Sequence, residues 1–99
     1  MLIRSQNKKY LVSTNNITFY VMDSEVICFG ISGIEDSDYI ILGHYETETK
    51  AMKVLDMLQE AYSEYQIMLN FSVSYLHEFK EKTDGFAIFQ MPEDSEVEV

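Results

Sequence analysis

Residues 39–58 constrain the fold of this 99-residue chain more than any other segment. The segment begins with an apolar run rich in β-branched and aromatic residues, which is typical of a buried strand. A short polar turn leads to Thr47, a residue type favoured as a helix N-cap, with a glutamate on each side near the positive end of the helix dipole. Apolar residues then recur at steps of three and four over residues 51–69, which predicts an amphipathic helix. This strand–helix junction indicates an α+β domain.

Three strand-like segments with short polar connections precede the helix, at residues 17–22, 26–31 and 39–45. Short connections between such strands predict an antiparallel β-meander. Two shorter apolar segments, at residues 2–4 and 10–13, flank a polar turn and predict a small hairpin. We therefore expect an antiparallel meander that packs against one long amphipathic helix.

The residues after the long helix predict three further features. The apolar spacing in residues 72–82 predicts a short second helix. Residues 86–91 predict a C-terminal strand that returns to the sheet beside the meander. Residues 93–99 carry four carboxylates, and we expect this acidic tail to be flexible, because it has little apolar surface to bury. The predicted organisation is a single domain over residues 1–92 followed by the tail.

The charge distribution narrows the choice of partner. The formal net charge is −10, and no lysine or arginine occurs in residues 10–49. Direct contact with a phosphate backbone or an anionic membrane needs clustered cations, so this composition argues against both. A basic protein partner fits the charge instead, by electrostatic steering. Nine residues form the predicted interaction surface: Asp23, Glu25, Glu35, Asp36, Asp38, Tyr39, Tyr45, Glu46 and Glu48.

No segment has a catalytic, cofactor or metal signature. Cys28 is the single cysteine and has no basic neighbour in sequence, so we expect a core residue and not a nucleophile. His44 and His77 lie at unrelated positions without ligand spacing. The acidic run at residues 35–38 lacks the twelve-residue calcium-loop pattern and predicts a solvated hairpin tip. We expect a protein without enzymatic activity, metal or cofactor.

The sequence also predicts a cytosolic location. The apolar runs reach about four residues, too few to span a bilayer. The first residues contain no apolar core of a secretory signal, and a lone thiol suits a reducing compartment.

Three motifs together resemble a family of small proteins encoded by Firmicutes bacteria and their phages or prophages. They are MLIRSQ at residues 1–6, YIILGHYETETKA at residues 39–51 and FQMPE at residues 89–93. The resemblance implies a bacterial or phage origin in the cytosol, and it brings no catalytic motif. The order of several strands before a long helix also resembles pleckstrin-homology-like domains, which implies an architecture but no function.

Two classes of function stay open. The first is a binding module that contacts a protein partner; one version is an acidic phage-encoded inhibitor that occupies the basic nucleic-acid groove of a host enzyme. The alternative is a protein that binds or sequesters a small nucleotide-type ligand, with aromatic rings stacked on the ligand and Arg4, Lys8 and Lys9 on its phosphates. A homodimer through an edge strand or the helix face is compatible with either class.

Overall fold

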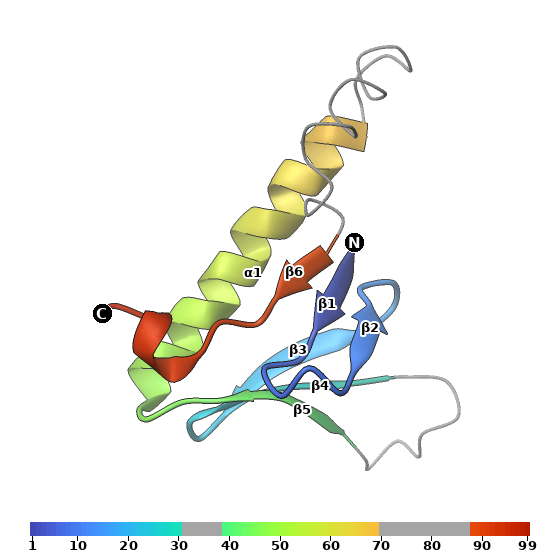
Figure 1. Ribbon diagram of the computed structural model, residues 1–99. Helices are drawn as coiled ribbons and strands as arrows, with labels where there is room; N and C mark the ends of the chain where they lie inside the picture. Colours follow the sequence, from blue (N-terminus) through green and yellow to red (C-terminus); the bar gives the residue numbers. More distant parts are fainter. Residues whose placement is uncertain (31–38, 70–87) are drawn as a thin grey trace.

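The computed structural model describes residues 1–30, 39–69 and 88–99, and these residues have the predicted α+β class (Figure 1). The predicted second helix at residues 72–82 lies outside the described residues. Glu35, Asp36 and Asp38 of the predicted interaction surface lie outside them as well. The elements in chain order are β1 (Leu2–Arg4), β2 (Leu11–Ser13), β3 (Thr18–Met22), β4 (Glu25–Phe29), β5 (Ile40–His44), α1 (Glu48–Leu69), β6 (Ile88–Gln90) and the 3-10 turn η2 (Asp94–Glu96).

Strands β3, β4 and β5 form the predicted antiparallel meander. Met22 pairs with Glu25, so a turn of only two residues, Asp23 and Ser24, joins β3 to β4. Asp23 has a φ of 55°. Two-residue hairpins need such left-handed backbone to match the twist of their strands, and Asp adopts it more readily than most residues. The aspartate at this position therefore suits the backbone conformation of the β3–β4 turn.

The C-terminal strand lies in a second sheet of order β2-β1-β6, and the prediction that it joins the meander is wrong. β6 runs parallel to β1, with Ile3 opposite Phe89, while β2 pairs with the other edge of β1 in antiparallel fashion. The physical reason lies in β1, whose Ile3 side chain is fully buried. Backbone groups of such a strand need partners on both edges, and β6 supplies them on the edge that β2 leaves free. The pleckstrin-homology-like resemblance stays a prediction.

Helix α1 begins at the predicted cap and buries the first half of its apolar face. The Thr47 Oγ1 accepts a hydrogen bond from the backbone N–H of Lys50 at 3.1 Å. Ala51, Val54 and Leu58 are buried, and α1 packs against β3 and β4. Beyond these residues α1 extends past the strands, and its apolar side chains there are more exposed (Figure 1). The helix and the two sheets thus share one core around the N-terminal half of α1.

The residues after β6 pack against the core, so the prediction of a flexible acidic tail is wrong for residues 93–97. Val97 is only 4% exposed and belongs to the core cluster. The turn η2 that precedes it has a capping box, in which the backbone N–H of Glu93 donates to Oε1 of Glu96 at 2.9 Å. Met91 and Val97 pack in the core. Asp94 bonds to Glu46 and Lys50, so both apolar and polar contacts hold this segment.

Candidate functional site

Three segments that are far apart in the sequence meet at the start of α1. The backbone N–H of Tyr45 donates to the Ser24 carbonyl at 2.9 Å, which joins the β3–β4 turn to the end of β5. The backbone N–H of Glu46 donates to Oδ1 of Asp94 at 2.7 Å, which joins η2 to the same place. We call the carboxylates of these segments the acidic end: Asp23, Glu25, Glu46, Glu48, Glu93, Asp94 and Glu96.

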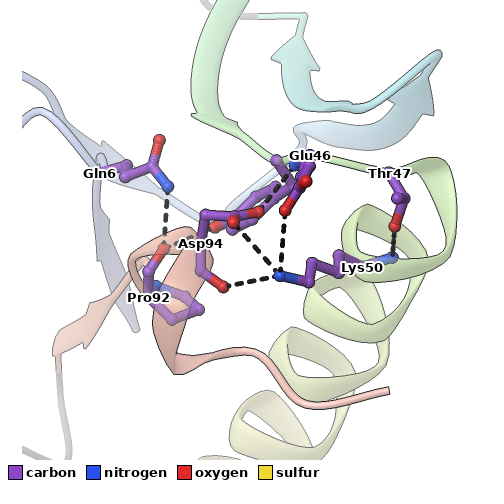
Figure 2. A network of polar contacts seen from close by, with 7 residues as sticks. Gln6, Glu46, Thr47, Lys50, Pro92 and Asp94 are labelled. Carbon is purple, nitrogen blue, oxygen red and sulfur yellow. Dashed lines mark hydrogen bonds and ion pairs between the residues drawn. The ribbon is translucent and has the colours of Figure 1, made fainter.

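Lys50 forms ion pairs with two carboxylates of the acidic end (Figure 2). Its Nζ lies 3.2 Å from Oδ2 of Asp94 and 3.9 Å from a carboxylate oxygen of Glu46. The hydrogen bond from the Glu46 backbone N–H, together with Lys50, lowers the pKa of the Asp94 carboxyl below its ordinary value. Asp94 therefore stays ionised, and its carboxylate joins η2 to the start of α1. The other carboxylates of the acidic end outnumber the cations around them.

His44 also contacts a carboxylate near this end. Its Nδ1 lies 3.6 Å from Oε2 of Glu25, on the neighbouring strand. The His44 side chain is largely exposed, so the pair lies at the surface, where such contacts contribute little to stability. The pair still places an ionisable group of β5 beside the β3–β4 turn.

The structure brings together four of the nine predicted surface residues: Asp23, Glu25, Glu46 and Glu48. Tyr39 is 45% exposed but lies at the opposite end of β5. Tyr45 was predicted at the surface, and this is wrong. It is 1% exposed, its hydroxyl donates to the Pro92 carbonyl at 2.9 Å, and burial raises its pKa. The ring is apolar enough for the core once the hydroxyl has a buried acceptor.

Sequence reasoning missed the carboxylates of residues 93–96, because it assigned them to a flexible tail. The signal that could have placed them is Val97, an apolar residue within the acidic segment that follows the rigid Pro92. Its burial brings Glu93, Asp94 and Glu96 to the start of α1.

Gln6 connects the two sheets with the C-terminal segment, a role that the sequence did not indicate. Its backbone N–H donates to the Leu42 carbonyl at 2.7 Å, and its Oε1 accepts from the His44 N–H at 2.9 Å. Its Nε2 donates to the Pro92 carbonyl at 3.1 Å (Figure 2). Gln6 thereby covers backbone groups on the free edge of β5 and holds the segment that leads into η2.

The described residues contain neither a cluster of metal ligands nor a helix that could span a membrane. Within residues 1–30, 39–69 and 88–99, no three His, Cys, Asp or Glu side chains gather as metal ligands would. The same part of the chain has no helix that is long and apolar enough to cross a membrane. Cys28 is fully buried in the core cluster, and burial raises the pKa of its thiol to about 11.

Cys28 is therefore expected to resist thiol reagents in the native protein. At pH 8 almost none of the thiol is ionised when its pKa is about 11, and the reactive form is the thiolate. A disulfide reagent such as dithionitrobenzoate should label Cys28 slowly in buffer and within seconds to minutes in denaturing urea. Rapid labelling of folded protein would contradict the buried position.

Comparisons of the chain with protein-family models, with curated proteins and with solved structures found no match. The arrangement of residues described above is thus the basis for a functional proposal.

Proposed function

We propose that this protein is a non-enzymatic binding module of bacterial or phage origin that contacts a protein partner in the cytosol through its acidic end. The observation that supports the proposal is the convergence of carboxylates from the β3–β4 turn, the start of α1 and η2. Hydrogen bonds between these segments hold their backbones, so the charges are presented without a large loss of conformational entropy on binding.

A basic protein surface is the partner that this charge favours. Complementary charge speeds encounter and excludes acidic partners, while it adds less to the final affinity. In the version for a phage-encoded chain, which the net charge of −10 motivates, the partner is a host enzyme whose basic groove otherwise binds nucleic acid. The acidic end would then compete with phosphate groups for the same cations.

Neutralising the acidic end should weaken capture of the partner. The test variant combines Asp23→Asn, Glu46→Gln and Glu48→Gln, and we expect binding on the order of tenfold weaker, because exposed ion pairs contribute about 0.2–1 kcal/mol each. The partner is first isolated at low salt, and its affinity for each variant is then measured by biolayer interferometry over a salt series.

The matched control removes three carboxylates from elsewhere on the surface. Asp56, Glu60 and Glu64 are exposed on α1, and their neutralisation changes the net charge by the same amount. We expect this control to bind nearly as well as the unmodified protein. A partner that is held equally well at high salt, or that is weakened equally by both variants, would rule out the acidic end as its binding surface.

A homodimer is the alternative protein partner within this proposal. Tyr20 and Ile41 are exposed apolar residues on the meander, and their exposure makes self-association through this sheet the version to examine first. Multi-angle light scattering after size exclusion measures the mass directly. A monomer at high micromolar concentration would leave the acidic end as the proposed contact.

A further inference from the structure

Three cations gather around one hollow on the exposed face of the β2-β1-β6 sheet. The hollow has a volume of about 250 Å³. We call it the basic hollow and define it by its lining residues: Arg4, Lys8, Lys9, Tyr10, Leu11 and Ile88. Leu11 lies opposite Arg4 in the pairing of β1 with β2, while Ile88 belongs to β6 on the other side of β1. All three strands of the sheet or their connections thus contribute to it.

Within the part of the chain that the structure describes, no carboxylate forms an ion pair with the cations of the basic hollow. Among the described residues, the ion pairs within 4.0 Å involve His44 and Lys50 but none of Arg4, Lys8 or Lys9. The chain has 17 acidic residues and only 7 lysines and arginines, so paired cations would be the ordinary outcome. Three like charges that lie together, with no ion-pair partner among residues 1–30, 39–69 and 88–99, favour binding of an anion.

The connection between β1 and β2 that carries the two lysines is held by its own hydrogen bonds. Ser5 is fully buried; its Oγ accepts from the Tyr10 N–H at 3.0 Å, and its carbonyl accepts from the Lys8 N–H at 2.9 Å. The Lys9 N–H donates to Oδ1 of Asn7 at 2.9 Å. The backbone of this connection is therefore held before a ligand binds, which lowers the entropic cost of ordering it around the ligand.

Arg4 also contacts the connection that carries the lysines. Lys8 in this connection has a φ of 65°, in the left-handed region. The Arg4 Nη2 lies 3.5 Å from the Lys8 carbonyl, so the guanidinium is directed toward the lysine-bearing connection. Arginine can then offer its planar pair of donors to an oxyanion, and the lysines add charge.

The remaining walls of the basic hollow are apolar and aromatic. Tyr10 is 46% exposed, and Leu11 and Ile88 are exposed beside it. A ring on a protein surface next to cations is the arrangement on which nucleobases stack. A second pocket, of about 280 Å³, is lined mainly by apolar residues such as Ile3, Phe19 and Leu58 and by no lysine or arginine. That second pocket could accept a ring, but it offers no cluster of lysine and arginine side chains for a phosphate.

We propose that the basic hollow binds a small organic phosphate that carries a flat ring, with mononucleotides as the representative class. Arg4, Lys8 and Lys9 hold the phosphate oxygens, and the ring lies against Tyr10 and the adjacent apolar side chains. This site shares no residue with the acidic end, so it does not depend on the protein partner proposed above.

Binding to the basic hollow is measured by titrating the four ribonucleoside monophosphates into ¹⁵N-labelled protein and following backbone amide shifts. The same titration is carried out with the matching nucleosides and with inorganic phosphate. We expect at least one monophosphate to shift the amides of Lys8, Lys9 and Tyr10, and to bind more tightly than either inorganic phosphate or its nucleoside. The affinity should fall as the salt concentration rises.

Three variants test which residues form the binding site. Lys8→Gln combined with Lys9→Gln should raise the dissociation constant of the monophosphate about tenfold or more, since hydrogen bonds to charged groups are the strong ones. Tyr10→Leu should weaken the monophosphate but leave inorganic phosphate unchanged. Lys53→Gln removes an exposed lysine of α1 and should have no effect. Amide spectra of each free variant show whether it is folded.

Two results would overturn the proposal. The first is the absence of shifts at Lys8, Lys9 and Tyr10 for all four monophosphates at millimolar concentration in low salt. The second is an equal loss of affinity in Lys53→Gln and in the double lysine variant, which would indicate charge screening without a site. Monophosphates that bind no more tightly than inorganic phosphate would likewise refute the role of the ring.

Discussion

Replacing Tyr45 with alanine is expected to lower the free energy of unfolding by about 3–5 kcal/mol, the usual cost of truncating a large buried aromatic residue. Tyr45 is the largest fully buried side chain among the described residues. Its ring packs on Gly43: a Cβ added at Gly43 would lie 2.7 Å from the Tyr45 hydroxyl oxygen. The truncation would empty this space and remove one of the two donors to the Pro92 carbonyl.

The measurement is equilibrium unfolding in urea, with Tyr39→Ala as the control. Tyr39 is the same residue type at the other end of the same strand, but it is 45% exposed. Its truncation should change the free energy of unfolding by only about 0.5 kcal/mol or less. Tyr45→Phe, which removes only the hydroxyl, should cost about 1 kcal/mol. Equal midpoints for Tyr45→Ala and Tyr39→Ala would show that Tyr45 is not in the core.

Removing residues 94–99 is expected to lower the free energy of unfolding by about 2–4 kcal/mol, which corresponds to a decrease in Tm of roughly 8–32 °C for a domain of this size. Burial of Val97 supplies about 1.5–3 kcal/mol of this. The rest reflects the Glu46 backbone N–H and the Lys50 ammonium, which both lose Asp94 as a partner.

Thermal unfolding followed by circular dichroism checks this prediction. A truncation that removes only Val99, which is 74% exposed, is the control and should leave Tm within a degree or two. The single substitution Val97→Ala separates the apolar contribution and should cost about 1.5 kcal/mol. If the truncated protein has the same Tm as the full-length chain, residues 94–99 are a tail without a structural role.

The elements that the sequence predicted well depend on neighbours along the chain. The Thr47 cap, the apolar spacing from Ala51 to Leu58 and the short polar turn between β3 and β4 are all present in the structure. Each of them depends on residues only a few positions apart, as helix caps, helical periodicity and tight turns generally do. The α+β class follows from their order.

The candidate surfaces were predicted less well, because a surface is defined by residues that are distant in sequence. The sequence indicated the carboxylates of the β3–β4 turn and of the start of α1, but not their meeting with residues 93–96. It also placed Tyr45 at the surface, since a tyrosine suits both a core and an interface. Only the acceptor at Pro92 decides between these positions.

The sequence by itself determined the excess of negative charge and, for the described residues, the six strands and the long helix in their order. The tertiary structure decided that β6 pairs with β1, that Val97 enters the core, and that Arg4, Lys8 and Lys9 lie around one hollow. The reason is that the partners of a strand edge, an apolar side chain or a charge are chosen by packing across the whole chain. Local propensity sets which segments exist, and long-range burial sets which of them meet.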